Sequence, residues 1–236
     1  MLYLHKLKII FVCLLMVLNL FFFTSCSNKN EINSNSKEEG KNGNMVLLPS
    51  FKDVSRNVFP STVSISIKSN KSAVGVIAFE DDENLYVLSI ASSFNYNGAE
   101  SEEFKIIYYD SDGNGLYEST GSIYKIDYNK NISIFKVGKV KNYNVAKLAD
   151  ISEMEKGDSI ITLFAIGNEC YISNGIFIGE KKHNKLNLKE VEINVNTYSN
   201  TIFNDKGELL GVSLPKDYNE YTVFVPVEYY ISLFNS

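Results

Sequence analysis

Ser199 and Cys170 are the residues whose side chains could act as nucleophiles, each in a region of predicted strands and turns. A serine or cysteine nucleophile needs a neighbouring base, a group that orients this base, and N–H donors for the oxyanion. Beyond the apolar N-terminal segment the chain has one histidine, His183, in a lysine-rich turn that is typical of solvated surface. A lysine base would have to be buried to lose its proton, and the lysines near Ser199 lie in turns. The residues therefore offer hydroxyl and thiol groups without an evident base.

One acidic loop has the first half of a calcium-binding pattern. Asp110, Asp112 and Asn114 carry oxygen atoms at alternate positions, and Gly115 is the sixth residue of the loop. The twelfth position is Gly121, where such a loop requires a bidentate glutamate. An Asp-Gly turn between two strands explains the same residues, so we expect a turn rather than a metal site. No cofactor is expected.

Short β-runs separated by turn residues fill the chain from residue 62 onward. A helix beginning with Ser50 as N-cap and ending near Pro60 comes before them, and a second helix is predicted at 227–234. This spacing favours an all-β sandwich or barrel. The clearest strands are 62–68, 74–79, 85–90, 104–109, 117–126 and 208–214, the last one entered through an Asp-Lys-Gly turn.

An ordered series of short matches, from about Phe51 to the end, resembles the trypsin-like serine proteases of the HtrA type. The resemblance implies an all-β fold of two packed antiparallel six-stranded β-barrels, with a short helix at each end. No single match is specific, but their order is. The matching segments are 60–65 (PSTVSI), 73–77 (AVGVI), 86–94 (YVLSIASSF), 129–137 (NKNISIFKV), 173–179 (SNGIFIG), 202–211 (IFNDKGELLG) and 223–227 (VFVPV).

The resemblance also locates three positions at which the family carries its catalytic residues. Ser92 stands where the family has histidine, Asn131 where it has aspartate, and Tyr198 where it has the nucleophilic serine. Glycines of the family's oxyanion loop are replaced as well. A classical triad cannot form from these residues, so we expect no catalytic residue, with Ser199 as a possible shifted nucleophile.

The groove between the barrels remains available to a protein without a triad. In the family, the strand after the nucleophile loop pairs with an extended peptide, which implies a groove at Val212, Ser213 and Leu214. We therefore expect an inactive domain, a pseudoprotease, that binds a peptide or protein there. The alternatives are an active serine endopeptidase with a non-standard site and a surface module without a groove, for example one blocked by Tyr198.

The N-terminus has the layout of a secretory signal. Residues 1–25 combine a short basic start with an apolar run, and Thr24 and Ser25 directly before Cys26 resemble a bacterial lipobox. This implies a lipid on Cys26, a polar tether at 26–45 and a domain at 46–236, outside the cytoplasm and anchored to a bacterial membrane. The alternative is an uncleaved anchor helix. With Cys26 modified, Cys170 has no partner for an intramolecular disulfide.

Composition and charge exclude some classes of protein. The formal charge is −5, and removal of the signal, which holds Lys6 and Lys8 and no acid, leaves −7. An acidic chain is not expected to bind nucleic acid. The 14 Gly and 4 Pro do not suggest a disordered or fibrous protein.

Overall fold

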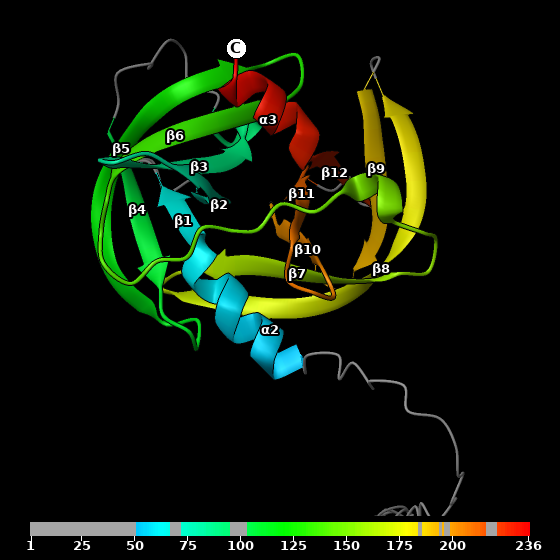
Figure 1. The fold of residues 1–236 in the computed structure, drawn as a ribbon, viewed down its shortest axis with the longest axis horizontal. Helices are drawn as coiled ribbons and strands as arrows, with labels where there is room; N and C mark the ends of the chain where they lie inside the picture. Colours follow the sequence, from blue (N-terminus) through cyan, green and yellow to red (C-terminus); the bar gives the residue numbers. More distant parts are fainter. Residues whose placement is uncertain are drawn as a thin grey trace, which may run out of the picture. The chain divides into compact units, whose positions relative to one another are not determined.

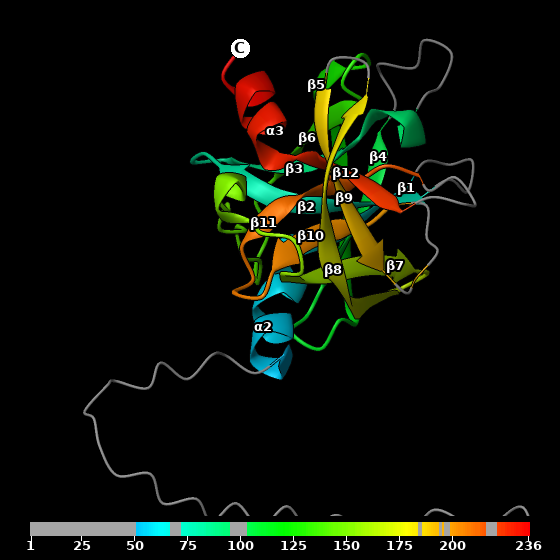
Figure 2. The same ribbon diagram turned by 90° about the vertical axis from the view of Figure 1, so that its right-hand side faces the viewer.

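The computed structural model describes residues 51–66, 72–94, 103–183, 186–193, 195, 199–215 and 221–236. Their strands form two closed antiparallel barrels of six strands each, with a short helix before the first barrel and another after the second (Figures 1 and 2). The predicted fold class is confirmed. Within these ranges, no helix combines the length and the apolar character that crossing a membrane requires.

The first barrel has the strand order β1-β2-β3-β6-β5-β4, and pairing of β1 with β4 closes it. Neighbouring strands in this barrel are consecutive in the sequence except where β3 meets β6 and where β4 closes on β1. The strands are β1 (Thr62–Ser66), β2 (Ser72–Glu80), β3 (Asn84–Ile90), β4 (Phe104–Tyr109), β5 (Gly115–Asp127) and β6 (Ile132–Gly138).

The second barrel has the order β10-β11-β12-β9-β8-β7 and is closed by pairing of β10 with β7. The β10–β11 hairpin contains the predicted Asp-Lys-Gly turn, in which Gly207 has a φ of 78°. The strands are β7 (Ser159–Ile166), β8 (Glu169–His183), β9 (Leu186–Ile193), β10 (Thr201–Asn204), β11 (Leu209–Ser213) and β12 (Thr222–Pro226).

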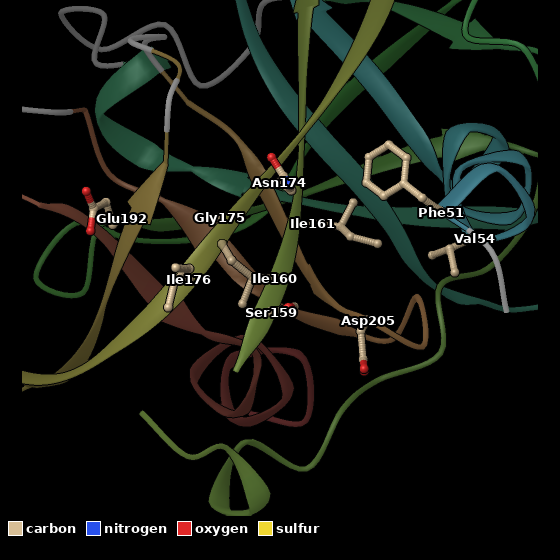
Figure 3. A pocket seen from close by; sticks show the side chains of 10 residues that line it. All are labelled: Phe51, Val54, Ser159, Ile160, Ile161, Asn174, Gly175, Ile176, Glu192 and Asp205. Carbon is tan, nitrogen blue, oxygen red and sulfur yellow. The ribbon is translucent and has the colours of Figure 1, made fainter. Parts of the chain in front are cut away.

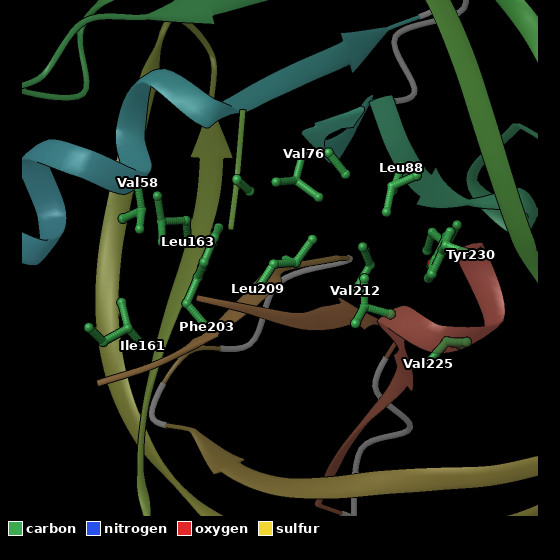
Figure 4. Close-up of a cluster of buried hydrophobic side chains, with 14 of the residues drawn as sticks. Val58, Val76, Leu88, Ile161, Leu163, Phe203, Leu209, Val212, Val225 and Tyr230 are labelled. Atoms are coloured by element: carbon green, nitrogen blue, oxygen red, sulfur yellow. The ribbon is translucent and has the colours of Figure 1, made fainter. Parts of the chain in front are cut away.

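Buried side chains form a core inside each barrel and a third cluster between the barrels. The cluster between the barrels takes Val76 and Leu88 from the first barrel and Leu163, Phe203 and Val212 from the second (Figure 4). All five are fully buried, and a buried side chain of this size contributes about 1.5–3 kcal/mol. Apolar burial therefore makes one folded unit of the two barrels.

The crossover between β6 and β7 adds backbone hydrogen bonds to both barrels. Ala146 N donates to Ile77 O of β2 at 2.8 Å, and Leu209 N of β11 donates to Lys147 O at 2.7 Å. Ala149 N then donates to Leu209 O at 3.0 Å. The crossover thus follows the junction of the barrels instead of looping away from it.

The C-terminal helix α3 (Val227–Phe234) follows directly on the last strand of the second barrel and packs on strands of both barrels. The ring of Phe234 stacks on Phe79 at a centroid distance of 4.4 Å and meets Tyr86 edge-on at 4.9 Å. Lys125 Nζ donates to Phe234 O at 2.9 Å. The chain end is therefore part of the contact between the barrels.

The N-terminal helix α2 (Phe51–Val58) is amphipathic, and its buried residues include Val54 and Val58, one turn apart. A Cβ at Gly207 would lie 3.1 Å from Val54 Cγ1 and 3.3 Å from Val58 Cγ1. The helix therefore rests on the β10–β11 turn, which a side chain at Gly207 would push away.

Two hairpin turns, one from each barrel, bind each other through their backbones. Cys170 N donates to Gly113 O and Gly115 N donates to Asn168 O, both at 2.8 Å. Gly113 has a φ of 85°, and a Cβ there would lie 2.5 Å from Cys170 O. Only glycine fits this position, because both the backbone conformation and the neighbouring carbonyl exclude a side chain.

We predict that Gly113→Ala lowers the free energy of unfolding by about 2–4 kcal/mol, from left-handed backbone strain plus the clash with Cys170 O. Urea unfolding at equilibrium measures this loss as a shift of the midpoint at constant slope. Gly157→Ala is the matched control, since Gly157 has a φ of 97° and a Cβ at that position would have no neighbouring atom within 4 Å. Equal losses in the two variants would show that the contact with Cys170 adds nothing.

Candidate functional site

Strand pairing in the first barrel brings together two of the three positions at which the resemblance places catalytic residues. Ile90, the last residue of β3, pairs with Ile132, the first residue of β6. Ser92 lies in the 3₁₀ turn Ala91–Phe94 directly after β3, and Asn131 directly precedes β6. The two residues are therefore neighbours across the end of one ladder, and both are half-buried.

Ser92 and Asn131 are joined by two hydrogen bonds. Ser92 N donates to Asn131 Oδ1 at 2.6 Å, and Asn131 Nδ2 donates to Ser92 Oγ at 3.0 Å. A third bond, from Ala91 N to Asn131 O at 3.2 Å, holds the backbone of Asn131 in place. Asn131 has a φ of 58°, a conformation that asparagine tolerates better than most residues.

The hydrogen bonds hold Ser92 and Asn131 in fixed positions relative to each other, but neither side chain can accept or release a proton near neutral pH. A carboxamide does not ionise, and a serine hydroxyl is not a base near neutral pH. The hydroxyl of Ser92 accepts a hydrogen bond from Asn131 Nδ2 instead of offering a basic nitrogen. The arrangement can position atoms, but it cannot take a proton from a nucleophile.

Ser199 lies at the contact between the barrels, with an exposed fraction of 3%. Val74 N of β2 donates to Ser199 Oγ at 2.9 Å, and Ser89 Oγ donates to Val74 O, also at 2.9 Å. The register of β2 with β3 begins only at Val76, so Val74 lies beyond that ladder. Two hydroxyls thus satisfy the backbone groups of Val74, one of them from the other barrel.

The hydroxyl of Ser199 therefore has a structural role in this contact. A buried N–H without a partner costs about 1–3 kcal/mol, which gives the serine a reason to be present other than catalysis. Tyr198, at the nucleophile position of the resemblance, lies outside the described residues, as do residues 196 and 197.

The residues predicted to form the peptide groove lie at the end of β11. Val212 is fully buried and pairs with Thr201 on one side and Val225 on the other. Ser213 is fully buried too: its N–H donates to Asn200 O at 2.8 Å, and its Oγ accepts from Asn200 N at 2.7 Å. Val212 and Ser213 therefore have strand neighbours on both sides.

Leu214 lies beyond the residues of β11 that pair with β10. Its N–H donates to Val223 O at 2.8 Å, and its side chain is half-buried against the cluster between the barrels. On the other side, β10 begins only at Thr201, and Ser199 turns to Val74 of the first barrel. Within the described residues, the β10 side of the chain beyond Ser213 is therefore without a paired strand.

The remaining sequence candidates lie elsewhere in the second barrel. Cys170 is buried at the start of β8, and desolvation raises the pKa of its thiol far above the ordinary value, so the thiolate is suppressed. His183 is exposed at the end of β8, in the hairpin that the sequence predicted. These positions favour a buried apolar role for the thiol and a surface role for the imidazole.

The acidic loop is a hydrogen-bonded turn. Asp110 Oδ1 accepts from the backbone N–H groups of Asp112 and Asn114, each at 2.9 Å. Burial alone would raise the pKa of Asp110, but these bonds keep it below its ordinary value. Among the described residues, no group of three or more His, Cys, Asp or Glu side chains could hold a metal ion.

Two closed antiparallel six-stranded barrels with a short helix at each end match the trypsin-like fold. The chain is similar to the crystal structure of Deg5, with a TM-score of 0.63 and 14% sequence identity. The match covers 76% of this chain and 89% of that chain. At this identity the likeness establishes the fold alone. No family model and no curated protein matches the sequence.

Sequence reasoning missed the hydrogen bond between Ser199 and Val74. The signal was weak, because Val74 belongs to a strand of the first barrel and lies 125 residues away along the chain. A polar residue next to a buried strand indicates a hydrogen bond but not its partner.

We predict that Asn131→Ala lowers the free energy of unfolding by about 2–3 kcal/mol, through the loss of two hydrogen bonds and the strain of a left-handed alanine. Asn142→Ala is the control, because Asn142 has a φ of 57° and is exposed. Asn131→Asp keeps the acceptor for Ser92 N and should cost less than Asn131→Ala. Denaturant unfolding of the three variants measures these differences; equal losses for Asn131→Ala and Asn142→Ala would refute a stabilising pair.

We predict that Ser199→Ala destabilises the protein by about 1–3 kcal/mol, because it leaves Val74 N buried without a partner. Ser133→Ala is the matched control: Ser133 is fully buried, and its Oγ has no hydrogen-bond partner. Removing that hydroxyl should be neutral or stabilising. Thermal unfolding monitored by circular dichroism measures the stability change of both variants. An unchanged midpoint for Ser199→Ala would show that Ser199 has no structural role.

Proposed function

We propose that this protein is an exported, lipid-anchored domain of trypsin-like fold that has no peptidase activity and binds an extended peptide or protein segment between its barrels. The observation that carries the proposal is the closed Ser92–Asn131 pair, in which a hydroxyl and a carboxamide stand where proton transfer would need a base and a carboxylate.

The bonding of Ser199 supports the absence of activity. Its hydroxyl accepts a bond from a backbone N–H and is buried between the barrels, so it is not presented to a substrate carbonyl. Loss of one triad member already costs roughly a million-fold in turnover in the best-studied hydrolase series. Because the residues at more than one triad position of the resemblance are replaced, we expect the site to bind a peptide without cleaving it.

The end of β11 supports binding by strand addition. Backbone groups of a strand alternate in direction: Ser213 N donates to Asn200 O and Leu214 N donates to Val223 O, so the carbonyl of Ser213 faces the side on which β10 runs. An extended segment placed there would pair with the backbone and place a side chain near Leu214. Such pairing needs no catalytic residue.

The N-terminal sequence supports the location. A basic start, an apolar run and small residues before Cys26 favour export and lipid attachment at this cysteine. The mostly polar residues that follow, up to residue 45, would act as a tether between the lipid and the domain.

We predict that the protein retains unfolded casein without cleaving it, and that Leu214→Asp weakens this binding about tenfold, or ~1.4 kcal/mol. A charge at this half-buried position should disfavour an apolar side chain of the added strand. Fluorescence anisotropy of labelled casein measures binding, and gel electrophoresis of the same samples measures cleavage. Val145→Asp is the control, because Val145 is an exposed apolar residue of the crossover.

Two results would contradict the proposal. Casein cleavage together with fluorophosphonate labelling, mapped by mass spectrometry to Ser199 or Tyr198, would establish an active endopeptidase. Equal binding by Leu214→Asp, Val145→Asp and the unaltered protein would exclude the end of β11 as the binding site. Since Ser199→Ala should also destabilise the fold, the labelled residue is identified directly and not by loss of activity in that variant.

A further inference from the structure

A cavity of about 520 Å³ lies outside the second barrel, beside helix α2 (Figure 3). Ser92, Asn131 and Ser199 are not among its lining residues, so it is separate from the site described above. Its volume falls in the range of ligand pockets. Phe51 and Val54 of α2 form one wall, and strands β7 and β8 form the floor.

A row of exposed side chains crosses the floor of this cavity. Ser159 of β7 pairs with Ile176 of β8, and Ile176 pairs with Glu192 of β9. Residues that face each other across a ladder have their side chains on the same face of the sheet. On the other side of β7, β10 pairs with it up to the residue before Asp205, so Asp205 follows next to Ser159. All four residues line the cavity and are exposed, so the row has a carboxylate at each end.

The charges of this row lie at its two ends. The side chain between Glu192 and Ser159 is that of Ile176, which is 46% exposed. Neighbouring strands lie about 4.8 Å apart, so the three spacings from β9 to β10 separate the Cα atoms of Glu192 and Asp205 by roughly 14 Å. Within the described residues, neither carboxylate has a hydrogen-bond or ion-pair partner, and no lysine or arginine lines the cavity. A ligand with two separated positive charges and a hydrocarbon chain between them would complement this row.

The wall formed by α2 favours the same ligand. The ring of Phe51 is 48% exposed beside the cavity. An aromatic ring packs on methylene groups, and its face attracts an ammonium group. The apolar and acidic parts of the cavity therefore fit an amphiphilic cation better than a neutral or an anionic molecule.

In the described part of the chain, the backbone of the floor leaves no edge for an extended peptide. Along this row, β8 pairs with β7 on one side and with β9 on the other, and β7 also pairs with β10. Strand addition requires unpaired backbone groups at a sheet edge, which these strands do not offer. Recognition here falls to side chains, which favours a small molecule of the size of the cavity over a protein segment.

We propose that this cavity binds a linear aliphatic polyamine, with one terminal ammonium group at Glu192, the other at Asp205, and the methylene chain along Ile176 and Phe51. Primary amines keep their proton near neutral pH, as the lysine side chain does, so both ends of the ligand are charged there. The cavity is separate from the end of β11, and the inference does not depend on whether that strand end binds a peptide. The bound ligand joins β9 to the β10–β11 turn, so it should also raise the unfolding temperature.

Isothermal titration calorimetry of the full-length protein in a non-ionic detergent, with spermidine as the probe, tests the proposal. We expect one saturable site that Asp205→Asn and Glu192→Gln each weaken roughly two- to fivefold, which corresponds to the loss of one exposed ion pair. Asparagine is a common turn residue, so Asp205→Asn leaves the hairpin intact. Asp82→Asn is the matched control, because Asp82 is an exposed acid of the β2–β3 turn and its loss should leave binding unchanged.

Two diamines of equal charge test the span of the site. Decamethylenediamine is long enough to reach both carboxylates, whereas putrescine can reach only one at a time. The unaltered protein should bind decamethylenediamine at least about fivefold more tightly, and Glu192→Gln should reduce this preference. A preference that is unchanged in Glu192→Gln would show that the apolar chain alone sets it, and would overturn the two-ended site.

Other results would overturn the proposal as well. Spermidine binding that Asp205→Asn and Glu192→Gln weaken no more than Asp82→Asn does would show a general attraction of amines to an acidic protein. The absence of saturable heat from both spermidine and decamethylenediamine would exclude this class of ligand. Binding of an oligolysine peptide in their place, weakened by Asp205→Asn and Glu192→Gln, would assign the cavity to a basic protein segment.

Discussion

The contact between the two barrels is the constraint on which the structure depends. Each barrel is closed and has its own apolar core, so neither needs the other to complete a sheet. What joins them is the shared cluster around Val76 and Leu163, the crossover, and the hydrogen bond from Val74 N to Ser199 Oγ. Each of these contacts links one barrel to the other, so a change at the junction must preserve the packing. The buried Ser199 shows that a hydroxyl at this junction can serve stability alone.

The Ser92–Asn131 pair shows how backbone pairing brings two polar side chains together. Its position is set by the backbone ladder of β3 with β6 and not by the side chains. Asparagine has the shape of aspartate, keeps an acceptor for Ser92 N and accepts a left-handed backbone. The strand register and the shape of the asparagine side chain therefore hold two uncharged side chains in a fixed hydrogen-bonded pair.

The strands and hairpins could be predicted from the sequence because they are local, whereas their arrangement in two barrels was implied by the resemblance. Alternating apolar residues and turn residues such as Gly207 identified the strands and their neighbours, and the final helix at 227–234 was predicted with its observed bounds. The assignment of Ser92 and Asn131 to the family's catalytic positions stays a prediction, to which the structure adds the hydrogen bonds between them. The partner of Ser199 depends on how two barrels dock, which no local pattern encodes. The position of Tyr198 lies outside the described residues, so its role stays a prediction.

The packing of Phe234 on Phe79 and Tyr86 has a consequence for how the chain folds. Phe234, which covers this face of the first barrel, belongs to α3, whereas Phe79 and Tyr86 belong to β2 and β3. The contact therefore joins segments that are far apart in the sequence, and such contacts form late because a long loop must close first. Until α3 docks, Phe79 and Tyr86 lack the ring that covers them, so the surface of the first barrel is completed only after the second barrel's last strand has been placed.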